Sequence, residues 1–411
     1  MIESIGIKNY KSIVDLQFDV GRVNVLIGEN GSGKSNILEA IALAAAAEAD
    51  KLDNEFLTSR GIRVTSPLLM RSNFRLNDQH YIEITIKFDG IKTPYIYKLK
   101  NSETPYSKWS FNRYNNLTNN DFREVDKEEE KLQGDLSEKE IANIVERISA
   151  QLLRYVGEEQ LSLDNLDAMV NSKLREIQYE SQLLFKDTII FKDTIIYSPE
   201  ETSLRNFYQD GQIEPLGIHG EGLFKLIMVL KSYSSDGHMK TFESSLKSFG
   251  WFESLDILEQ KSTMEEEPRL KIVDLCIDEI LDQRSINEGF LFVLFYTALM
   301  VSKDTPSIFA IDNVDASLNP KLCTKIVSDI VRLAKQFDKQ CFLTAHNPAV
   351  LDGIDLGDDE QRLFVVSRNR KGHTRIKRIT LEDKPVSSTG EDLKLSEAFL
   401  RGYLGGLPKN F

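Results

Sequence analysis

The sequence predicts an α/β fold with three parts: a mixed sheet carrying a phosphate-binding loop, an antiparallel β lobe beside it, and a short helical-hairpin insertion. Three stretches indicate this. The motif GENGSGKS at 28–35 lies between an apolar strand and an alanine-rich helix. The run SIFAIDN at 307–313 ends on an acid, as a buried parallel strand of an α/β sheet does. Residues 80–100 alternate in polarity on both sides of an Asp-Gly turn, which predicts a hairpin.

The bulk composition is that of a soluble globular protein. The 411 residues are 41% hydrophobic and 28% charged, enough for one large domain with insertions or for two or three smaller ones. Because no stretch predicts a membrane span or a signal peptide, we expect a cytoplasmic protein without a membrane partner. We expect Cys276, Cys323 and Cys341 to be small buried thiols in a reducing compartment.

The net charge of −13 argues against nonspecific coating of nucleic acid, which depends on Lys and Arg, but not against a local basic patch. The basic candidate is the segment 362–378, which we expect to form a hairpin around an Arg-Lys-Gly turn. Its charges would either contact nucleic-acid phosphates or simply be solvated.

The motif at 28–35 fits the pattern G-x-x-x-x-G-K-[ST]. Its glycines let backbone N–H groups surround phosphate oxygens, and the following helix start adds positive potential. Lys34 would reach the β- and γ-phosphates of ATP, and the Ser35 hydroxyl would bind Mg²⁺. The predicted nucleotide-binding residues are Gly28, Glu29, Asn30, Gly31, Ser32, Gly33, Lys34, Ser35 and Asn36.

Two further strands end on candidate site residues. Asp312 ends the run at 307–313 and would bind Mg²⁺ beside Ser35. About thirty residues later, CFLTAHNPAVL at 341–351 predicts another strand followed by His346. This histidine would contact the γ-phosphate; the alternative is a surface histidine at a strand end.

These features resemble the ABC-type ATPase superfamily, and within it the RecF, SMC and OLD-like branch. The stretch IESIGIKNYKSIVDLQFDVGRVNVLIGENGSGKSNILEAI and the stretch YSPEETSLRNF at 197–207 carry the resemblance. It implies a homodimer in which two ATP molecules are sandwiched between two heads. It also implies a signature loop that caps the γ-phosphate of the other subunit, best matched by SINEGFLFVLFYTALM. The residues for that role are Ser285, Asn287 and Gly289; the alternative is a simple N-cap of a helix at 290–300.

In the family a glutamate follows the strand aspartate and activates the attacking water, but here that place holds Asn313. A carboxamide cannot accept a proton, and general-base assistance is typically worth roughly 10²–10⁴-fold in rate. We therefore predict tight ATP binding with slow or absent hydrolysis. The alternative is that Asp315, in a stretch resembling the family's D-loop, replaces the glutamate, although that loop should point its side chains across the dimer interface. The candidate catalytic residues are Asn313, Asp315 and His346.

The chain divides into an N-terminal half of the head, a helical insertion, a C-terminal half with the signature loop and His346, and a docking tail, at 1–125, 126–186, 187–380 and 381–411. A capping box at 137–140 opens two amphipathic stretches, which form either a local contact surface or a packed subdomain. The hexapeptide FKDTII occurs at 185–190 and again at 191–196, and one copy should be the strand that leads into YSPEE. The apolar tail at 395–411 either packs on the head or docks a partner, and oligomer contact is favoured.

The resemblance extends to stand-alone ATPases that act as sensor subunits of bacterial anti-phage systems. The ATPase of Septu-type systems, which partners a separate HNH nuclease, is similar in length, in its short insertion and in its poor catalytic motif. This implies a nucleotide sensor or scaffold in a higher oligomer that regulates a nuclease chain. The alternative is a RecF-like DNA-repair ATPase that binds DNA directly. An ABC transporter motor is disfavoured by the signature sequence, and a toprim domain of the OLD type is not expected.

Overall fold

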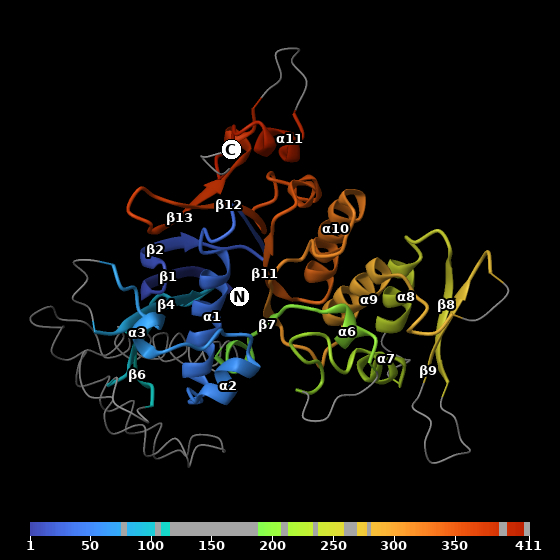
Figure 1. Cartoon of the computed structure of the whole chain (residues 1–411), viewed down its shortest axis with the longest axis horizontal. Coiled ribbons are helices and arrows are strands. Elements are labelled where there is room, and N and C mark those ends of the chain that lie inside the picture. The colour runs from blue at the N-terminus through green and yellow to red at the C-terminus, as the bar shows by residue number, and fades with distance from the viewer. Residues whose placement is uncertain are drawn as a thin grey trace, which may run out of the picture.

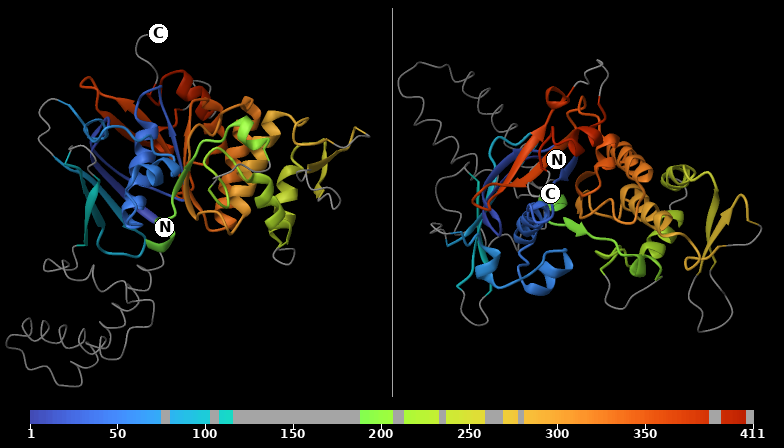
Figure 2. Two further views of the ribbon diagram at one scale, coloured as in Figure 1. Left: turned by 60° about the horizontal axis from the view of Figure 1, so that its bottom comes forward. Right: turned by 45° about the horizontal axis from the view of Figure 1, so that its top comes forward.

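The computed structural model describes residues 1–74, 80–102, 108–115, 188–206, 213–232, 237–258, 269–277, 281–385 and 393–406. An antiparallel lobe lies on one side of a mixed sheet, and a layer of helices lies on the other side (Figure 1). The same arrangement is visible in two further views, where the ribbon of β8 (Phe252–Leu258) and β9 (Arg269–Asp274) projects from the helical side (Figure 2). Among the described residues, no helix has the length and apolarity needed to span a membrane.

The mixed sheet has the strand order β13-β12-β3-β11-β10-β7. All neighbours in it are parallel except β12 and β13, which form an antiparallel edge hairpin and confirm the hairpin predicted at 362–378. The strands are β3 (Val23–Ile27), β7 (Ile195–Tyr197), β10 (Ile308–Ile311), β11 (Gln340–Ala345), β12 (Gln361–Arg368) and β13 (Thr374–Ile379). Because parallel strands end at one edge, this sheet brings residues 28, 312 and 346 to the same edge.

The mixed sheet separates two hydrophobic cores. In β3, Val25 and Ile27 belong to the core on the helical side, whereas Leu26 belongs to the core on the side of the antiparallel lobe. The same alternation occurs in β11, where Leu343 and Phe342 face opposite cores. A strand buried on both faces needs continuous apolar sequence, and β3, β10 and β11 have it.

The antiparallel lobe has the strand order β2-β1-β4-β5-β6. Its strands are β1 (Ile2–Tyr10), β2 (Ile13–Asp19), β4 (Ile82–Phe88), β5 (Tyr95–Lys100) and β6 (Ser110–Asn115). The predicted hairpin at 80–100 is confirmed as β4 and β5. The short helices α2 (Asn54–Ser59) and α3 (Pro67–Met70) flank this lobe.

The helix α1 (Lys34–Glu48) follows the phosphate-binding loop and is buried between the two sheets. Its run Ala44–Ala47 is fully covered, with each side chain at most 1% exposed. A helix enclosed on all sides needs no polar face, and alanine both favours helix and allows close packing. The alanine-rich sequence is therefore the consequence of this position.

The helical layer contains α6 (Glu201–Leu204), α7 (Leu223–Ser232), α8 (His238–Leu246), α9 (Glu288–Val301) and α10 (Pro320–Gln336), with the ribbon β8 (Phe252–Leu258) and β9 (Arg269–Asp274). Every residue of α9 from Phe290 to Val301 is buried, so this helix forms the centre of the layer. Two 3₁₀ helices, η3 (Pro348–Gly353) and η4 (Leu381–Asp383), and the helix α11 (Leu395–Leu400) follow β11 and β13.

The C-terminal segment packs back on the head. Leu395, Phe399 and Leu404 are buried in the core of the helical side, and Ser396 bonds to Asp352 through its backbone and its hydroxyl group. Leu400 and Tyr403 remain about two-thirds exposed, at 64% and 60%. The docking of a partner on this tail stays a prediction, and residues 407–411 lie outside the described part of the chain.

Three further sequence predictions concern the cysteines, the helical insertion and the repeated hexapeptide. Cys323 and Cys341 are buried as predicted, but Cys276 is exposed, because it lies in the turn after β9 rather than in the core. The capping box and the amphipathic stretches at 126–186 lie outside the described residues. The second FKDTII leads into β7 as predicted, whereas residues 188–191, which join the two copies, are helical.

Candidate nucleotide-binding site

The loop 28–33 connects β3 to α1 and is held in a tight conformation by its glycines. Gly33 has φ +108°, and a Cβ there would lie 2.2 Å from Thr374 Oγ1. A Cβ at Gly28 would lie 2.0 Å from the carbonyl oxygen of Val366. Only glycine fits at either position. Ser32 Oγ is buried and has no hydrogen-bond partner among the described residues, so this loop contains a hydroxyl suited to a phosphate oxygen.

Lys34 lies at the start of α1 with its ammonium group against the loop. Nζ donates to the carbonyl oxygens of Gly28 over 2.8 Å and Glu29 over 3.1 Å. Burial lowers the pKa of Lys34 to about 8, and the carboxylates of Asp312 and Asp315 oppose this shift. A buried cation beside backbone N–H groups is an arrangement that stabilises a polyphosphate.

Ser35 and Asp312 meet as predicted from their positions at the strand ends. Ser35 Oγ lies 2.9 and 3.1 Å from the two carboxylate oxygens of Asp312. Asp312 follows β10 directly, and its backbone N–H donates to the carbonyl oxygen of Tyr197 on β7. A hydroxyl and a carboxylate in contact provide the oxygen ligands that Mg²⁺ prefers. The residues therefore fit ATP with Mg²⁺: Ser35 and Asp312 would hold the ion, and the loop would hold the phosphates.

Asn313 has a left-handed backbone conformation, with φ +59°. Asparagine and aspartate adopt this region more readily than other non-glycine residues. Its backbone N–H donates to Thr344 Oγ1 over 2.9 Å, and the Thr344 hydroxyl in turn donates to Asp312. The position after Asp312 thus holds a half-buried carboxamide whose backbone is fixed by β11.

Asp315 bonds within its own chain. Its Oδ2 accepts hydrogen bonds from the backbone N–H groups of His346 over 3.0 Å and Asn347 over 2.6 Å. Its Oδ1 is buried and has no partner among the described residues. Two backbone donors from the segment after β11 thus hold one carboxylate oxygen within the chain, and the expectation that this loop directs the Asp315 side chain across an interface stays a prediction.

His346 lies beside the phosphate-binding loop. Its Nδ1 is 3.5 Å from Lys34 Nζ, which places it in the site that contains Ser35 and Asp312. Burial, and then the charge of Lys34, lower the pKa of His346. The ring is therefore neutral at pH 7 and can donate one hydrogen bond and accept another.

The predicted signature residues lie elsewhere in the chain, at the start of α9 in the helical layer (Figure 1). Asn287 is the N-cap of α9, and its side chain accepts from the backbone N–H of Phe290 over 2.9 Å. Ser285 Oγ donates to Asp282 over 2.7 Å, and Gly289 is in the first turn of the helix. The N-cap interpretation is thus observed, and a role on the ATP of a second subunit stays a prediction.

Sequence analysis missed a buried ionic cluster next to the site. Glu39, on α1, is 2% exposed and accepts from Tyr10, Lys11 and Arg63. Burial lowers the pKa of Arg63, but Glu39 and, more weakly, Asp312 raise it above its usual value. An acid in the middle of an otherwise apolar helix was the available signal, because a buried carboxylate requires cationic partners.

The basic hairpin of β12 and β13 contacts the loop 28–33 through Thr374. Thr374 Oγ1 donates to the carbonyl oxygen of Ser32 over 2.9 Å and is 2.7 Å from Ser12 Oγ. Ser12 Oγ also accepts from Asn36 over 2.7 Å. The exposed basic residues of this hairpin are Arg368, Arg370, Lys371, Arg375 and Lys377.

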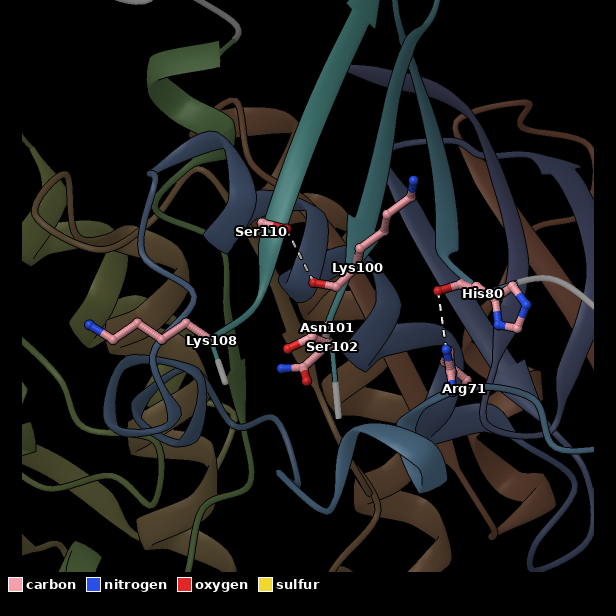
Figure 3. A pocket seen from close by; sticks show the side chains of 7 residues that line it. All are labelled: Arg71, His80, Lys100, Asn101, Ser102, Lys108 and Ser110. Atoms are coloured by element: carbon pink, nitrogen blue, oxygen red, sulfur yellow. Dashed lines mark hydrogen bonds between the residues drawn. The ribbon is translucent and has the colours of Figure 1, made fainter. Parts of the chain in front are cut away.

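A second basic surface lies on the antiparallel lobe, in a hollow of about 690 Å³. Among the described residues, four cationic or titratable side chains and three polar ones line it, and none of these is a carboxylate: Arg71, His80, Lys100, Lys108, Asn101, Ser102 and Ser110 (Figure 3). Arg71 donates to the carbonyl oxygen of His80 over 3.1 Å. None of these residues belongs to the nucleotide motifs.

Part of the sequence matches known proteins. The family model described as AAA domain matches residues 4–267, which is more than half of the chain. The DNA replication and repair protein RecF of Bacillus cytotoxicus is 42% identical over 55 residues, which is 13% of this chain and 15% of that protein. An uncharacterised protein of Methanocaldococcus jannaschii is 40% identical over 67 residues, which is 15% of this chain and 31% of that protein. The chain thus spans less than a third of these relatives.

Among solved structures, the crystal structure of the SmcHead bound to the C-winged helix domain of ScpA covers 93% of this chain and 98% of its own chain. The TM-score is 0.53 and the sequence identity is 13%. This likeness shows a common fold, an α/β head with a mixed sheet and an antiparallel sheet.

Proposed function

Since this chain belongs to the AAA domain family and has the fold of an SMC head, we propose that it binds ATP with Mg²⁺ at the loop 28–35 and uses the nucleotide to join two copies. The observation that carries the proposal is the contact of Ser35 Oγ with both oxygens of Asp312, beside a loop that requires glycine at positions 28 and 33. Mg²⁺, when bound, would neutralise phosphate charge there.

ATP would persist in this site because the residues that could activate water are unsuited to it. Asn313 offers a carboxamide, which can orient water but cannot accept its proton. Asp315 is engaged by the N–H groups of His346 and Asn347. His346 would meet the γ-phosphate through a neutral ring, because burial and Lys34 disfavour its protonation. The protein would therefore hold the triphosphate for long periods.

Pairing would place the start of α9 of one copy on the ATP held by the other. Ser285 and Asn287 are exposed, and the first turn of α9 provides backbone N–H groups with positive potential. ATP favours the paired state only to the extent that it binds the paired state more tightly than the unpaired state. Contacts from Ser285, Asn287 and Gly289 would supply that difference.

Light scattering with and without nucleotide tests this function. The wild type should pair with ATP and Mg²⁺ but not with ADP. Lys34→Ala should remain unpaired, because it lacks the cation for the phosphates. A wild type that stays monomeric at saturating ATP would refute the proposal.

We further infer that the paired head acts as a nucleotide sensor or scaffold in bacterial anti-phage defence, as part of a higher oligomer that regulates a separate HNH nuclease chain of Septu type. The carboxamide of Asn313 supports this role, because a protein that keeps its ATP would report the nucleotide level rather than perform work. Affinity capture and mass spectrometry with ATP and without it would test it. Recovery of no nuclease chain from the native host in either condition would count against it.

A second candidate function is a RecF-like ATPase that binds DNA directly. The basic hollow on the antiparallel lobe favours it, because Lys and Arg that contact phosphates dominate DNA affinity. Binding to a fluorescent duplex should then weaken steeply with salt, and Lys100→Ala with Lys108→Ala should flatten the salt dependence. The triple variant Arg368→Ala, Arg370→Ala, Lys371→Ala would show whether the β12–β13 hairpin contributes. Absence of ATP-dependent DNA binding at low salt would exclude this candidate.

A further inference from the structure

Arg205, the residue that follows α6, holds the segment before α9 with a single side chain. Its Nη1 donates to the carbonyl oxygens of Gln283 over 2.8 Å and Arg284 over 3.1 Å. Its Nη2 donates to the carbonyl oxygen of Ile286 over 2.9 Å. The guanidinium also bonds Glu201 through Nε and Nη2, over 2.9 and 2.7 Å. Three of the four carbonyl groups at 283–286 thus bond one arginine, whose side chain is only 22% exposed.

This segment leads directly into the predicted signature residues. Its backbone N–H groups at Arg284 and Ser285 donate to Asp282, so the acceptor Asp282 holds the N–H groups of the loop and the donor Arg205 holds its carbonyl groups. Asn287 follows and caps α9, which leaves the side chains of Ser285 and Asn287 exposed. Hydrogen bonds from Arg205 to the backbone carbonyl groups therefore hold the loop that would meet the ATP of a second copy.

The segment that contains Arg205 begins at β7, beside the edge of the sheet where Asp312 lies. The carbonyl oxygen of Tyr197, eight residues before Arg205, accepts from the backbone N–H of Asp312. The Tyr197 ring contacts Phe295 of α9 edge to face, with centroids 5.8 Å apart. A short path of packed contacts therefore joins the metal-binding acid to the signature loop.

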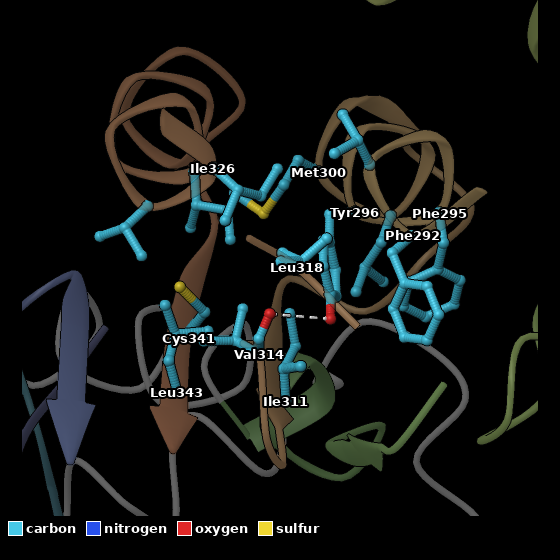
Figure 4. Packing of buried hydrophobic residues seen from close by; sticks show 14 of the residues in the cluster. Phe292, Phe295, Tyr296, Met300, Ile311, Val314, Leu318, Ile326, Cys341 and Leu343 are labelled. Atoms are coloured by element: carbon cyan, nitrogen blue, oxygen red, sulfur yellow. Dashed lines mark hydrogen bonds between the residues drawn. The ribbon is translucent and has the colours of Figure 1, made fainter. Parts of the chain in front are cut away.

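A second contact ties α9 to the residues just after Asp312. Tyr296 donates through its hydroxyl to the carbonyl oxygen of Val314 over 3.2 Å, inside the core where Phe295 and Ile311 pack (Figure 4). The middle of α9 is thus tied to the sheet through Phe295 and Tyr296, and Arg205 contacts the loop before it.

We propose that Arg205 is a positioning residue that holds residues 283–286 in the conformation in which Ser285 and Asn287 reach ATP bound by a second copy of this chain. The inference rests on the proposed function and names the residue that couples the nucleotide edge of one copy to its pairing surface. Lysine cannot replace it, because a guanidinium donates in a rigid fork to several acceptors, whereas an ammonium is a point charge.

Arg205→Gln separates this role from a general structural one. The monomer should bind a fluorescent ATP analogue with unchanged affinity, because Arg205 does not contact the loop 28–35. Pairing driven by ATP should weaken about tenfold or more, and Arg205→Lys should weaken it nearly as much. The matched control is Arg332→Gln, which removes an arginine that bonds Ser245 and pairs with Asp329 in the same helical layer. This control should pair like the wild type.

Mixing variants tests action on the partner's nucleotide. A copy with Arg205→Gln and a copy with Lys34→Ala together form one site with an intact loop 28–35 and an intact signature segment. This mixture should recover pairing with ATP. A double variant carrying both substitutions, mixed with wild type, forms no intact mixed site and should give no mixed pairs.

The outcomes distinguish the two proposals. If wild type does not pair with ATP, the proposed function fails. If wild type pairs and Arg205→Gln pairs equally well, only the role of Arg205 is overturned. Loss of ATP binding by the Arg205→Gln monomer, or the absence of recovery in the first mixture, would also overturn it. If Arg205→Gln lowers the thermal midpoint so far that it does not fold, Arg205→Lys carries the same measurements.

Discussion

The carboxylate of Asp315 accepts a hydrogen bond from the backbone N–H of His346, over 3.0 Å. The same oxygen accepts from Asn347 over 2.6 Å. Asp315 therefore fixes the segment after β11, on which His346 approaches Lys34.

This contact predicts how Asp315 variants behave. Asp315→Asn keeps an acceptor oxygen for both N–H groups, so ATP affinity and the residual turnover should remain within about twofold of wild type. Asp315→Ala leaves two donors without their acceptor and should weaken ATP binding by displacing His346. Single-turnover assays with radiolabelled ATP measure both variants. A turnover that drops more than about tenfold in Asp315→Asn would identify Asp315 as the general base.

The left-handed backbone conformation of Asn313 determines which acidic residue can best replace it, and such a substitution tests whether a carboxylate there raises ATP turnover. Asn313→Asp keeps the side-chain length and tolerates φ +59°, so it should raise turnover, by up to roughly 10²-fold. Asn313→Glu places a residue less suited to this conformation and should cost about 1 kcal/mol of stability. Steady-state phosphate release and chemical denaturation compare the two. If neither substitution changes a turnover that is already fast, the carboxamide does not limit hydrolysis.

The Thr344 hydroxyl bonds both Asp312 and the backbone of Asn313. We expect it to contribute more to the free energy of unfolding than a hydroxyl in an exposed hydrogen bond does. Thr344→Val preserves the shape of the side chain, but it leaves the N–H of Asn313 without its acceptor and removes one of the hydroxyl donors to Asp312, the other being Ser35. We expect the free energy of unfolding to fall by about 1–3 kcal/mol. Thr344→Ser, which keeps the hydroxyl, is the matched control. Equal stability of the valine and serine variants in urea denaturation would contradict the linkage.

Lys339 predicts a pH dependence of stability away from the nucleotide site. It is 3% exposed, its Nζ donates to Thr305 Oγ1 over 2.7 Å, and burial lowers its pKa to about 7. The unfolded chain, in which lysine titrates near its ordinary value, binds more protons between pH 7 and that value, so stability rises with pH there.

The difference in unfolding free energy between wild type and Lys339→Met should therefore move in favour of wild type as pH rises from 7 to 9, by at most about 1.4 kcal/mol per pH unit. Lys192→Met removes an exposed lysine and should give no such change. A pH-independent difference for Lys339→Met would show that the buried lysine stays charged throughout.

The sequence predicted those parts of the site that depend on local pattern. The strand before Gly28, the helix after Ser35 and the acid at the end of β10 follow from apolar runs and a loop motif, and parallel strands bring their ends together. The site needs little more than this for Ser35 to meet Asp312.

Contacts between distant segments could not be predicted in this way. Thr374 reaches Ser32 across 342 positions, and Arg205 reaches Ile286 across 81. Periodicity shows which face of an element is buried but not which segment covers it. Cys276 was predicted to be buried because its neighbours Leu275 and Ile277 are apolar, but all three residues lie in an exposed turn.

The measurement that tests the central claim most directly is the nucleotide content of the paired species. The protein is incubated with ATP and Mg²⁺, the pair is isolated by size exclusion, and its nucleotide is quantified by ion-exchange chromatography over several hours. We predict about one ATP per chain with little ADP, because a carboxamide stands where a base is needed. Pairs that contain mainly ADP, or the absence of pairs, would contradict it.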